Sequence, residues 1–286
     1  MARRVRSLVG KVVVITGGAR GIGAATAKAL AGLGASVAIG DLDLDLAKGT
    51  AEEVDGLALP LDVTDRGGFT RFLDEVEGQL GPIDVLVNNA GIMALGAFED
   101  EDDRTTGRQL AVNLHAVIHG TRKAVRRMRP RGTGHIVNVA SAAGKAGFPG
   151  GATYCATKHG VVGLSEAVRN ELRGSGVEIS VVMPAVVRTE LAAGLVESRF
   201  VKPVEASDVA DAIVQTLQRP RFDVFVPRSL DATFRFTRLL PRVAAEWVAR
   251  TFKGDQVLFG ASPEARREYE ARAAASAPGA DREGRA

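Results

Sequence analysis

The sequence predicts an α/β protein built around a doubly wound parallel sheet. Short runs of β-branched and other apolar residues alternate with longer segments whose apolar residues recur every three or four positions. The first of these runs passes directly into a glycine-rich turn, a combination typical of such sheets. The chain has 286 residues, 45% of them hydrophobic, which is enough for one full core.

The expected strands and helices alternate along the chain, the βαβ pattern of a parallel sheet covered on both faces. We expect about seven strands, at 11–16, 36–40, 57–61, 83–87, 135–140, 178–183 and 222–226. The helices are expected at 24–33, 43–53, 66–80, 103–129, 152–173 and 206–218. No internal repeat is visible, and we expect residues 1–228 to form one domain.

The turn after the first strand has the character of a phosphate site. It reads Gly17-Gly18-Ala19-Arg20-Gly21-Ile22-Gly23, with glycines in a G-x-x-x-G-x-G spacing. Glycines let a pyrophosphate approach the backbone, and the following helix presents unpaired N–H groups to it. A glycine turn can also serve geometry alone. The next strand favours the binding interpretation, because it ends in Asp41, whose carboxylate can accept bonds from adenosine ribose hydroxyls.

Tyr154 and Lys158 are the most chemically informative pair. Apolar residues at helical spacing follow them until Gly174, so we expect both on one helix face, a turn apart. A phenol is a poor base at neutral pH, but a nearby ammonium favours the phenolate and lowers the tyrosine pKa. Alone, such a pair is more often a solvated surface feature; the other motifs favour a catalytic role.

Taken together, the motifs resemble the short-chain dehydrogenase/reductase family over about residues 8–228. They are Thr16-Gly17-x-x-x-Gly21-Ile22-Gly23, Asn88-Asn89-Ala90-Gly91, Asn113, Ser141 and Tyr154-x-x-x-Lys158. The resemblance implies a Rossmann fold with Tyr154 as general acid/base and Ser141 holding the substrate oxygen. It further implies that Lys158 binds the nicotinamide ribose and lowers the Tyr154 pKa, while Asn113 supports a water-linked proton relay.

The same resemblance implies the cofactor contacts. It sets Asn89, Ala90 and Gly91 beside the adenosine ribose, and Asp62 and Val63 beside the adenine. The full expected set is Gly17, Arg20, Gly21, Ile22, Gly23, Asp41, Asp62, Val63, Asn89, Ala90, Gly91, Tyr154, Lys158, Pro184, Val187 and Thr189. The chain departs from the family at Ala185, where a glycine is usual, which leaves the path of that loop open. We expect no metal.

Two residues disagree about which nicotinamide cofactor is used. Asp41 lies where the 2′-phosphate of NADP would sit, and like-charge repulsion there favours NAD. Arg20 can instead pair with a 2′-phosphate. We favour NAD, because a flexible arginine can turn to solvent or to Asp41, whereas the repulsion is hard to escape.

Composition bounds the partners and the compartment. The 37 basic and 34 acidic residues leave a net charge of +3, which gives no case for a nucleic acid partner. A single cysteine, Cys155, fits a reducing compartment and a small apolar filler. We expect a cytoplasmic protein without signal peptide or membrane span. The family resemblance also implies a homodimer or homotetramer, built from the helices near 103–129 and 152–173.

The C-terminal region extends beyond the family pattern. We expect a helical extension over 229–270 and a disordered tail over 271–286. Between Phe234 and Phe252, large apolar residues interleave with arginines, and Pro241 is expected to break the segment. Such a helix can lie on an anionic membrane surface, but we favour packing on the substrate cleft or on a partner subunit.

The residues expected around the substrate are mainly apolar: Met93, Ala142, Ala143, Phe148, Pro149 and the segment 190–201. We therefore predict an oxidoreductase that interconverts a secondary alcohol and a ketone on a steroid-, terpenoid- or lipid-like substrate. Two alternatives are an NADPH-dependent carbonyl or acyl-chain reductase, and a dinucleotide-sensing or scaffold protein without turnover. The complete acid/base set argues against the last.

Overall fold

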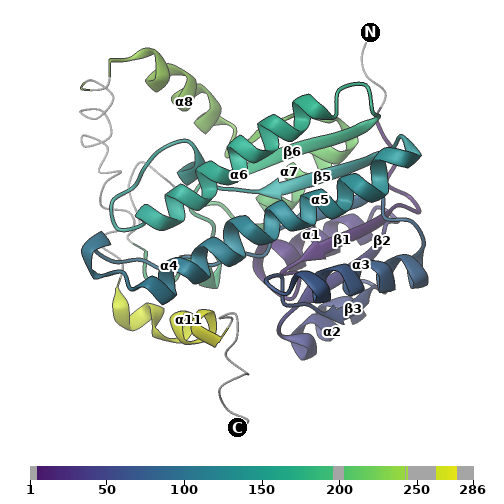
Figure 1. Cartoon of the computed structure of the whole chain (residues 1–286), viewed down its shortest axis with the longest axis horizontal. Helices are drawn as coiled ribbons and strands as arrows, with labels where there is room; N and C mark the ends of the chain where they lie inside the picture. The colour runs from purple at the N-terminus through teal and green to yellow at the C-terminus, as the bar shows by residue number, and fades with distance from the viewer. Residues whose placement is uncertain (1–4, 196–202, 242, 244–261, 276–286) are drawn as a thin grey trace.

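A seven-stranded parallel sheet forms the centre of the protein (Figure 1). The structure is a computed structural model that describes residues 5–195, 203–241, 243 and 262–275. The strands run in the order β3-β2-β1-β4-β5-β6-β7. Their bounds are β1 Val12–Thr16, β2 Ser36–Asp41, β3 Leu57–Pro60, β4 Val85–Asn88, β5 Gly134–Val139, β6 Val177–Pro184 and β7 Asp223–Val226.

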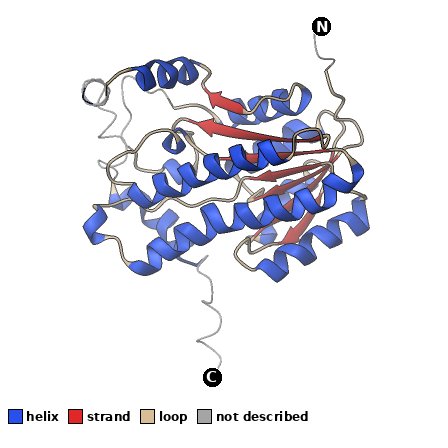
Figure 2. Ribbon diagram, turned by 45° about the horizontal axis from the view of Figure 1, so that its top comes forward, coloured by secondary structure: helices blue, strands red, loops and turns tan. Residues whose placement is uncertain are grey.

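Helices cover both faces of the sheet, as Figures 1 and 2 show. One face packs on α1 (Gly21–Ala31), α2 (Leu44–Glu52) and α7 (Ala206–Gln218). The other packs on α3 (Arg66–Leu80), α5 (Ala116–Met128) and the C-terminal end of α6 (Ala152–Glu171). Side chains of β1 alternate between the two cores: Val13 and Ile15 face the first, Val12 and Val14 the second. This confirms the predicted doubly wound fold.

The chain order reverses between β1 and β4. β1 pairs with β2 on one side and with β4 on the other, so the connections leave the two strands in opposite directions. In open α/β sheets, ligands bind in the crevice at the carboxyl ends of the strands at such a switch point. The glycine loop after β1 and the Asn88–Gly91 segment at the end of β4 both lie there.

The helix expected at 103–129 is interrupted. It consists of α4 (Asp103–Leu110), a π-helical turn (Ala111–His115) and α5. A π turn bonds each carbonyl to the amide five residues on, and such turns are frequent at functional sites. Asn113 lies in this turn and is fully buried.

Two C-terminal helices follow the sheet within the described residues. α8 (Ser229–Leu239) contacts β7 and ends before Pro241. α11 (Pro263–Ala275) continues five residues into the stretch expected to be a disordered tail. Much of the predicted Phe234–Phe252 segment, like residues 276–286, lies outside the described residues. No described helix is long and apolar enough to cross a membrane.

Candidate active site

The turn after β1 brings the backbones of two strands into close contact. Gly17 has φ +64°, and a Cβ there would lie 2.8 Å from the Cα of Ala90. A Cβ on Gly23 would lie 2.2 Å from the carbonyl oxygen of Gly17. Both positions therefore require glycine, Gly17 for its conformation and Gly23 for the packing of α1 on the turn.

Asn89 and Thr16 fix the position of the β4 end. The Asn89 amide group donates to the carbonyl oxygens of Thr16 (3.0 Å) and Gly17 (2.8 Å). The Thr16 hydroxyl accepts from the backbone N–H groups of Asn89 and Ala90. These bonds lock the glycine turn against the next strand of the switch point.

The start of α1 fits a pyrophosphate. The residue before the helix, Arg20, makes no side-chain cap, and the first turn carries no acidic residue. The first N–H groups of the helix therefore face outward without a side-chain acceptor, beside glycines that leave room for close approach. This chemistry fits the diphosphate of a dinucleotide, with Gly17, Arg20, Gly21, Ile22 and Gly23 around it.

Asp41 and Arg20 are held apart from one another. The Asp41 carboxylate accepts from the backbone N–H groups of Ala19 (3.0 Å) and Asp43 (3.1 Å), which fixes it at the end of β2. Arg20 pairs with Asp43 at 2.6 Å and with Glu190 at 3.1 Å. Arg20 thus turns to two other carboxylates rather than to Asp41.

Asp62 and Val63 follow β3, at the same edge of the sheet. The Asp62 carboxylate accepts from the backbone and the hydroxyl of Thr64, and Val63 is buried. Neither residue lines the large pocket described next, which lies at the other end of the crevice.

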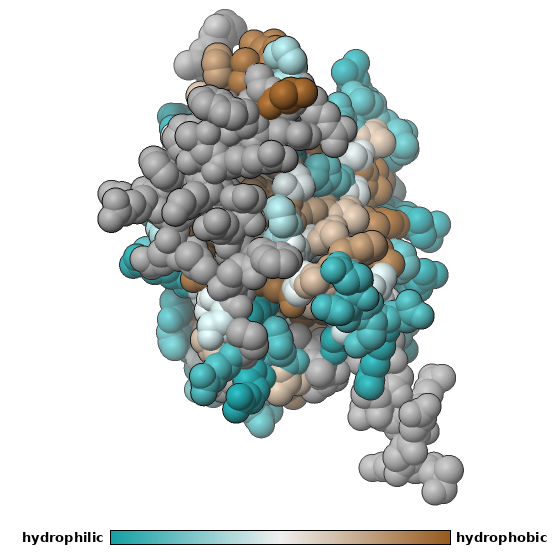
Figure 3. All heavy atoms as spheres, turned by 90° about the vertical axis from the view of Figure 1, so that its left-hand side faces the viewer, coloured by the Kyte–Doolittle hydropathy of each residue, from teal (hydrophilic) through white to brown (hydrophobic). Residues whose placement is uncertain are grey.

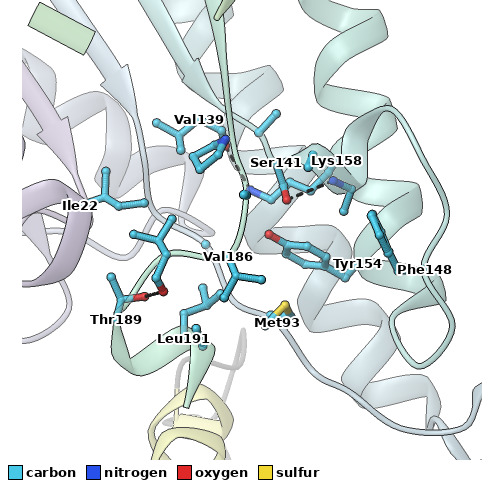
Figure 4. Close-up of a pocket in the computed structure, with 18 of the residues that line it drawn as sticks. Ile22, Met93, Val139, Ser141, Phe148, Tyr154, Lys158, Val186, Thr189 and Leu191 are labelled. Carbon is cyan, nitrogen blue, oxygen red and sulfur yellow. Dashed lines mark hydrogen bonds between the residues drawn. The ribbon is translucent and has the colours of Figure 1, made fainter. Parts of the chain in front are cut away.

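Tyr154, Ser141 and Lys158 meet at one cavity of about 190 Å³ (Figure 4). Tyr154 and Lys158 come from α6, and Ser141 follows β5. The Tyr154 hydroxyl points into the cavity on the side of Ser141. Other predicted cofactor contacts line the same cavity: Ile22, Asn89, Gly91, Pro184, Val187 and Thr189.

Burial is the main cause of the pKa shifts of Tyr154 and Lys158. It raises the pKa of Tyr154, with a smaller opposing effect from the hydrogen bond with Ser141. It lowers the pKa of Lys158 to about 8. The Lys158 ammonium lies 5.6 Å from the centre of the Tyr154 ring and donates to the carbonyl oxygen of Val139 at 3.1 Å. The structure thus differs from the expected lowering of the Tyr154 pKa, because desolvation of the phenolate dominates.

Asn113 fixes the chain after Gly91. Its side chain pairs with both backbone groups of Ile92, each at 2.8 Å, and its amide also donates to Thr157 on α6. A Cβ at Gly91 would lie 3.3 Å from the Asn113 oxygen and 3.6 Å from the Lys158 ammonium nitrogen. The asparagine therefore lies close to the lysine, with Gly91 between them.

The loop after β6 follows an ordinary path at Ala185. Among the described non-glycine residues, positive φ occurs at Asp55 and not at Ala185. The Ala185 N–H donates to the carbonyl oxygen of Val226 at 2.7 Å, which ties the loop to β7. Alanine is therefore compatible with the loop. Thr189 donates to the carbonyl oxygen of Val187 and lies against Gly21.

The rest of the cavity wall is apolar. From the expected substrate residues, the wall contains Met93, Ala142, Ala143, Phe148, Leu191, Ala192 and Leu195. Pro149 is exposed and does not line the cavity, because the turn after Phe148 directs it outward. Residues 196–201 lie outside the described residues.

Sequence reasoning missed part of the wall. Leu230 and Phe234 of α8 line the cavity, and Phe234 stacks on Phe225 of β7 with ring centres 5.5 Å apart. The sequence favoured packing of the segment from Phe234 onward on the substrate cleft or on a partner subunit, but it assigned neither Leu230 nor Phe234 to the cavity. Their four-residue spacing does not by itself say which surface the helix covers. Val139, Ala140 and Val186 also line the cavity.

The described part of the chain contains no candidate metal centre. Among the residues that the structure describes, no group of three or more His, Cys, Asp or Glu side chains is arranged to hold a metal ion. Burial raises the pKa of the Cys155 thiol, so this side chain packs as a small apolar group behind Tyr154.

Comparison with known proteins identifies similar chains. The family model described as short chain dehydrogenase matches residues 11–199. The 2,5-dichloro-2,5-cyclohexadiene-1,4-diol dehydrogenase of Sphingobium indicum is 37% identical over 193 residues, covering 66% of this chain and 77% of that protein. The 3-alpha-(or 20-beta)-hydroxysteroid dehydrogenase of Mycobacterium tuberculosis is 36% identical over 211 residues, covering 71% of this chain and 81% of that protein.

A solved structure is also similar. It is a short chain dehydrogenase/reductase from Burkholderia phymatum in complex with NAD. That chain is 28% identical, with a TM-score of 0.75, and the match covers 82% of this chain and 94% of that one.

The buried Lys158 makes a testable contribution to folding stability. In the unfolded chain a lysine keeps its proton up to its ordinary pKa of 10.5, whereas folded Lys158 releases it near pH 8. The unfolded state therefore binds more protons in this window, and stability rises with pH. We expect the free energy of unfolding of wild type, relative to Lys158→Met, to increase by about 3 kcal/mol from pH 8 to 10.5. Urea denaturation at fixed protein concentration measures it; parallel pH curves would contradict the shift.

Proposed function

The chain belongs to the short-chain dehydrogenase/reductase family of NAD(P)-dependent oxidoreductases acting on CH–OH groups, and on that premise we propose that it interconverts a hydrophobic secondary alcohol and its ketone. The observation that carries the proposal is the meeting of Tyr154, Ser141 and Lys158 at a mainly apolar cavity. A steroid-, terpenoid- or lipid-like skeleton fits such a wall.

We assign proton transfer to Tyr154. A bound nicotinamide dinucleotide supplies the acceptor or donor of the hydride. The Tyr154 hydroxyl faces the cavity, where it can take the proton of the substrate hydroxyl or return one to the carbonyl oxygen. Its raised pKa keeps the phenol protonated at neutral pH. In that form it serves directly as the acid for ketone reduction. For alcohol oxidation it must first lose its proton, which we assign to a water-linked relay past Lys158 and Asn113 to solvent.

Ser141, Lys158 and Asn113 support this transfer. The Ser141 oxygen accepts from the N–H of Ala143 at 3.1 Å, so the hydroxyl hydrogen is directed elsewhere and can reach the substrate oxygen. Lys158 uses one donor on Val139 and has two more for a ribose hydroxyl or a water. Asn113 positions the Gly91 turn next to the ammonium, consistent with a proton path on that side.

The cavity wall supports the substrate class. Among the residues that the structure describes, the polar side chains of the wall are those assigned to chemistry or cofactor, and Lys158 is the one Arg or Lys that lines it. This described wall offers a carboxylate substrate no further cation to pair with, and burying a carboxylate unpaired is costly. Two similar proteins are named as dehydrogenases of a chlorinated cyclohexadiene diol and of hydroxysteroids, both alicyclic alcohols.

We propose NAD as the preferred cofactor. The Asp41 carboxylate is fixed by two backbone N–H groups at the end of β2, where it can accept from ribose hydroxyls. Arg20, the candidate partner for a 2′-phosphate, is neutralised by Asp43 and Glu190. The similar structure from Burkholderia phymatum contains NAD. The alternative, an NADPH-dependent reductase, requires Arg20 to leave both carboxylates.

We also propose that copies of the chain associate through α6. Its outer face carries exposed small residues, Ala152, Ala156, Gly163 and Ala167, at the spacings of one helix face. Small residues allow close packing of a second helix.

Membrane contact by the C-terminal extension stays a prediction. Phe236 and Leu239 of α8 are exposed. Hydrophobic residues, drawn brown, gather at the top of the view in Figure 3, the end of the molecule at which α8 lies in Figure 1.

Replacing Tyr154 by Phe tests the reaction. The change removes the proton-transferring oxygen and leaves the ring, so we expect kcat to fall by about 10³-fold with NADH affinity nearly unchanged. Activity is measured on steroid, terpenoid and fatty-chain alcohols beside small anionic hydroxy acids, and affinity by nicotinamide fluorescence. Full activity in the variant would exclude the mechanism, and turnover of small anionic acids alone would exclude the substrate class.

Replacing Asp41 by Ala tests the cofactor preference. We expect wild type to bind NADH more tightly than NADPH, and the variant to lose at least about tenfold in NADH affinity while gaining for NADPH. The matched control is Asp45→Ala, whose carboxylate is exposed in the first turn of α2. Tighter NADPH binding by wild type would make Arg20 the deciding residue.

Replacing Ala167 by Arg tests self-association. We expect sedimentation velocity to show wild type as a dimer or tetramer and Ala167→Arg as a smaller species, because a large charged side chain blocks close helix packing. Gln79→Arg, on the exposed face of α3, serves as control and should sediment like wild type. Unchanged assembly of Ala167→Arg would remove α6 as the interface.

A further inference from the structure

Arg266 is a charged side chain in an unusual place. It lies on α11 and is 1% exposed, which ranks it among the largest fully buried side chains of the described residues. Its guanidinium pairs with Glu270 at 3.1 Å, but the Glu270 side chain is half exposed. Burying an arginine is costly unless its donors are satisfied, so the remaining contacts must offset that cost.

Those contacts join two distant segments of the cavity wall. One Arg266 terminal nitrogen donates to the carbonyl oxygens of Leu191 (3.2 Å) and Ala193 (3.1 Å), in the loop after β6. The other donates to the carbonyl oxygen of Met93 at 2.6 Å, in the segment after β4. One planar guanidinium therefore bridges the two segments whose side chains form the cavity wall below Tyr154 (Figure 4).

Tyr269 provides a second hydrogen bond to the Met93 backbone. Its hydroxyl accepts from the Met93 N–H at 2.7 Å, and its ring lies 5.0 Å from the Arg266 guanidinium carbon. Met93 is buried beyond the end of β4, where the sheet no longer supplies partners for its backbone. Both backbone polar groups of Met93 thus bond to side chains of α11.

The start of α11 docks on the same loop independently. The Ser262 N–H donates to the carbonyl oxygen of Gly194 at 2.9 Å. Gly194 has φ +73°, and a Cβ there would lie 2.8 Å from the Ser262 carbonyl oxygen. The left-handed backbone of Gly194 and its lack of a side chain therefore allow the start of α11 to lie against the loop.

We propose that Arg266 and Tyr269 are positioning residues of the substrate site. By fixing the backbones of Met93 and Leu191, they hold the two apolar side chains that face the hydrophobic part of the substrate. α11 thereby supports this part of the wall through its bonds to these two segments. The substrate part of this inference rests on the proposed function; the contact network does not.

The test compares Arg266→Met with Arg267→Met. Both remove a guanidinium and keep a long side chain on α11, but Arg267 is exposed. Tyr269→Phe removes only the hydroxyl that accepts from Met93. Hydrogen–deuterium exchange of peptides covering residues 90–96 and 188–195 reports the positioning without any substrate. Steady-state kinetics on a turned-over hydrophobic alcohol and NADH fluorescence report its consequence.

For Arg266→Met we expect about tenfold faster exchange in both peptides and unchanged exchange in β1 and β5. KM for the alcohol should rise about tenfold with kcat and NADH affinity nearly constant, and Arg266→Lys should recover part of the loss. Tyr269→Phe should speed exchange only around Met93, and Arg267→Met should behave as wild type.

Two results would overturn the proposal. Unchanged exchange in Arg266→Met would show that the guanidinium does not hold the wall. Faster exchange throughout the sheet, with NADH affinity lost in parallel, would show a general role in stability. A wild type that turns over no hydrophobic alcohol would instead contradict the proposed function, and the exchange measurement would still decide whether the network holds the wall.

Discussion

The close approach of the chain at Gly17 and Ala90 is the constraint on which the rest of the site depends. It occurs at the switch point, where the connections after β1 and β4 leave in opposite directions. Because these connections diverge, a crevice lies at the carboxyl ends of the two strands. Asn89 and Thr16 lock it with bonds between the two strand ends. From this point the glycine turn leads to the uncapped start of α1, and Gly91 leads past Asn113 to Lys158. The residues proposed for cofactor binding and for catalysis are therefore positioned by the same contact.

Desolvation connects the chemistry to the substrate. The apolar wall that suits a hydrophobic alcohol also surrounds Tyr154 and Lys158, raising the pKa of the phenol and lowering that of the ammonium. Both shifts favour the uncharged form of each group. The Lys158 ammonium has the Val139 carbonyl oxygen as its protein partner, so its charge is sensitive to whatever polar group a cofactor brings beside it. In the function that we propose, substrate preference and proton transfer thus have the same physical origin.

The C-terminal helices complete and support the wall of the cavity. α8 supplies Leu230 and Phe234 on one side, while α11 fixes Met93 and Leu191 through Arg266 and Tyr269. The two helices use opposite chemistry: α8 contributes apolar side chains directly, and α11 acts through backbone bonds from buried polar groups. The outer surface of α8 still exposes Phe236 and Leu239. α8 therefore has two apolar surfaces: one lines the cavity and the other faces outward.

The sequence by itself determined the sheet, the order of its elements, the family and the catalytic motifs, because these depend on local periodicity and on short spacings such as Tyr154-x-x-x-Lys158. Tertiary structure decided what depends on distant contacts: the partners of Arg20, the burial that raises the Tyr154 pKa, and the contribution of Leu230 and Phe234 to the cavity wall. Arg266 and Tyr269 are the clearest case. Tyr269 is one of only two tyrosines in the chain, but its partner Met93 lies on a segment far away in the sequence. No local pattern encodes such a contact. It exists only once the sheet has folded and α11 has packed on the segments that follow β4 and β6.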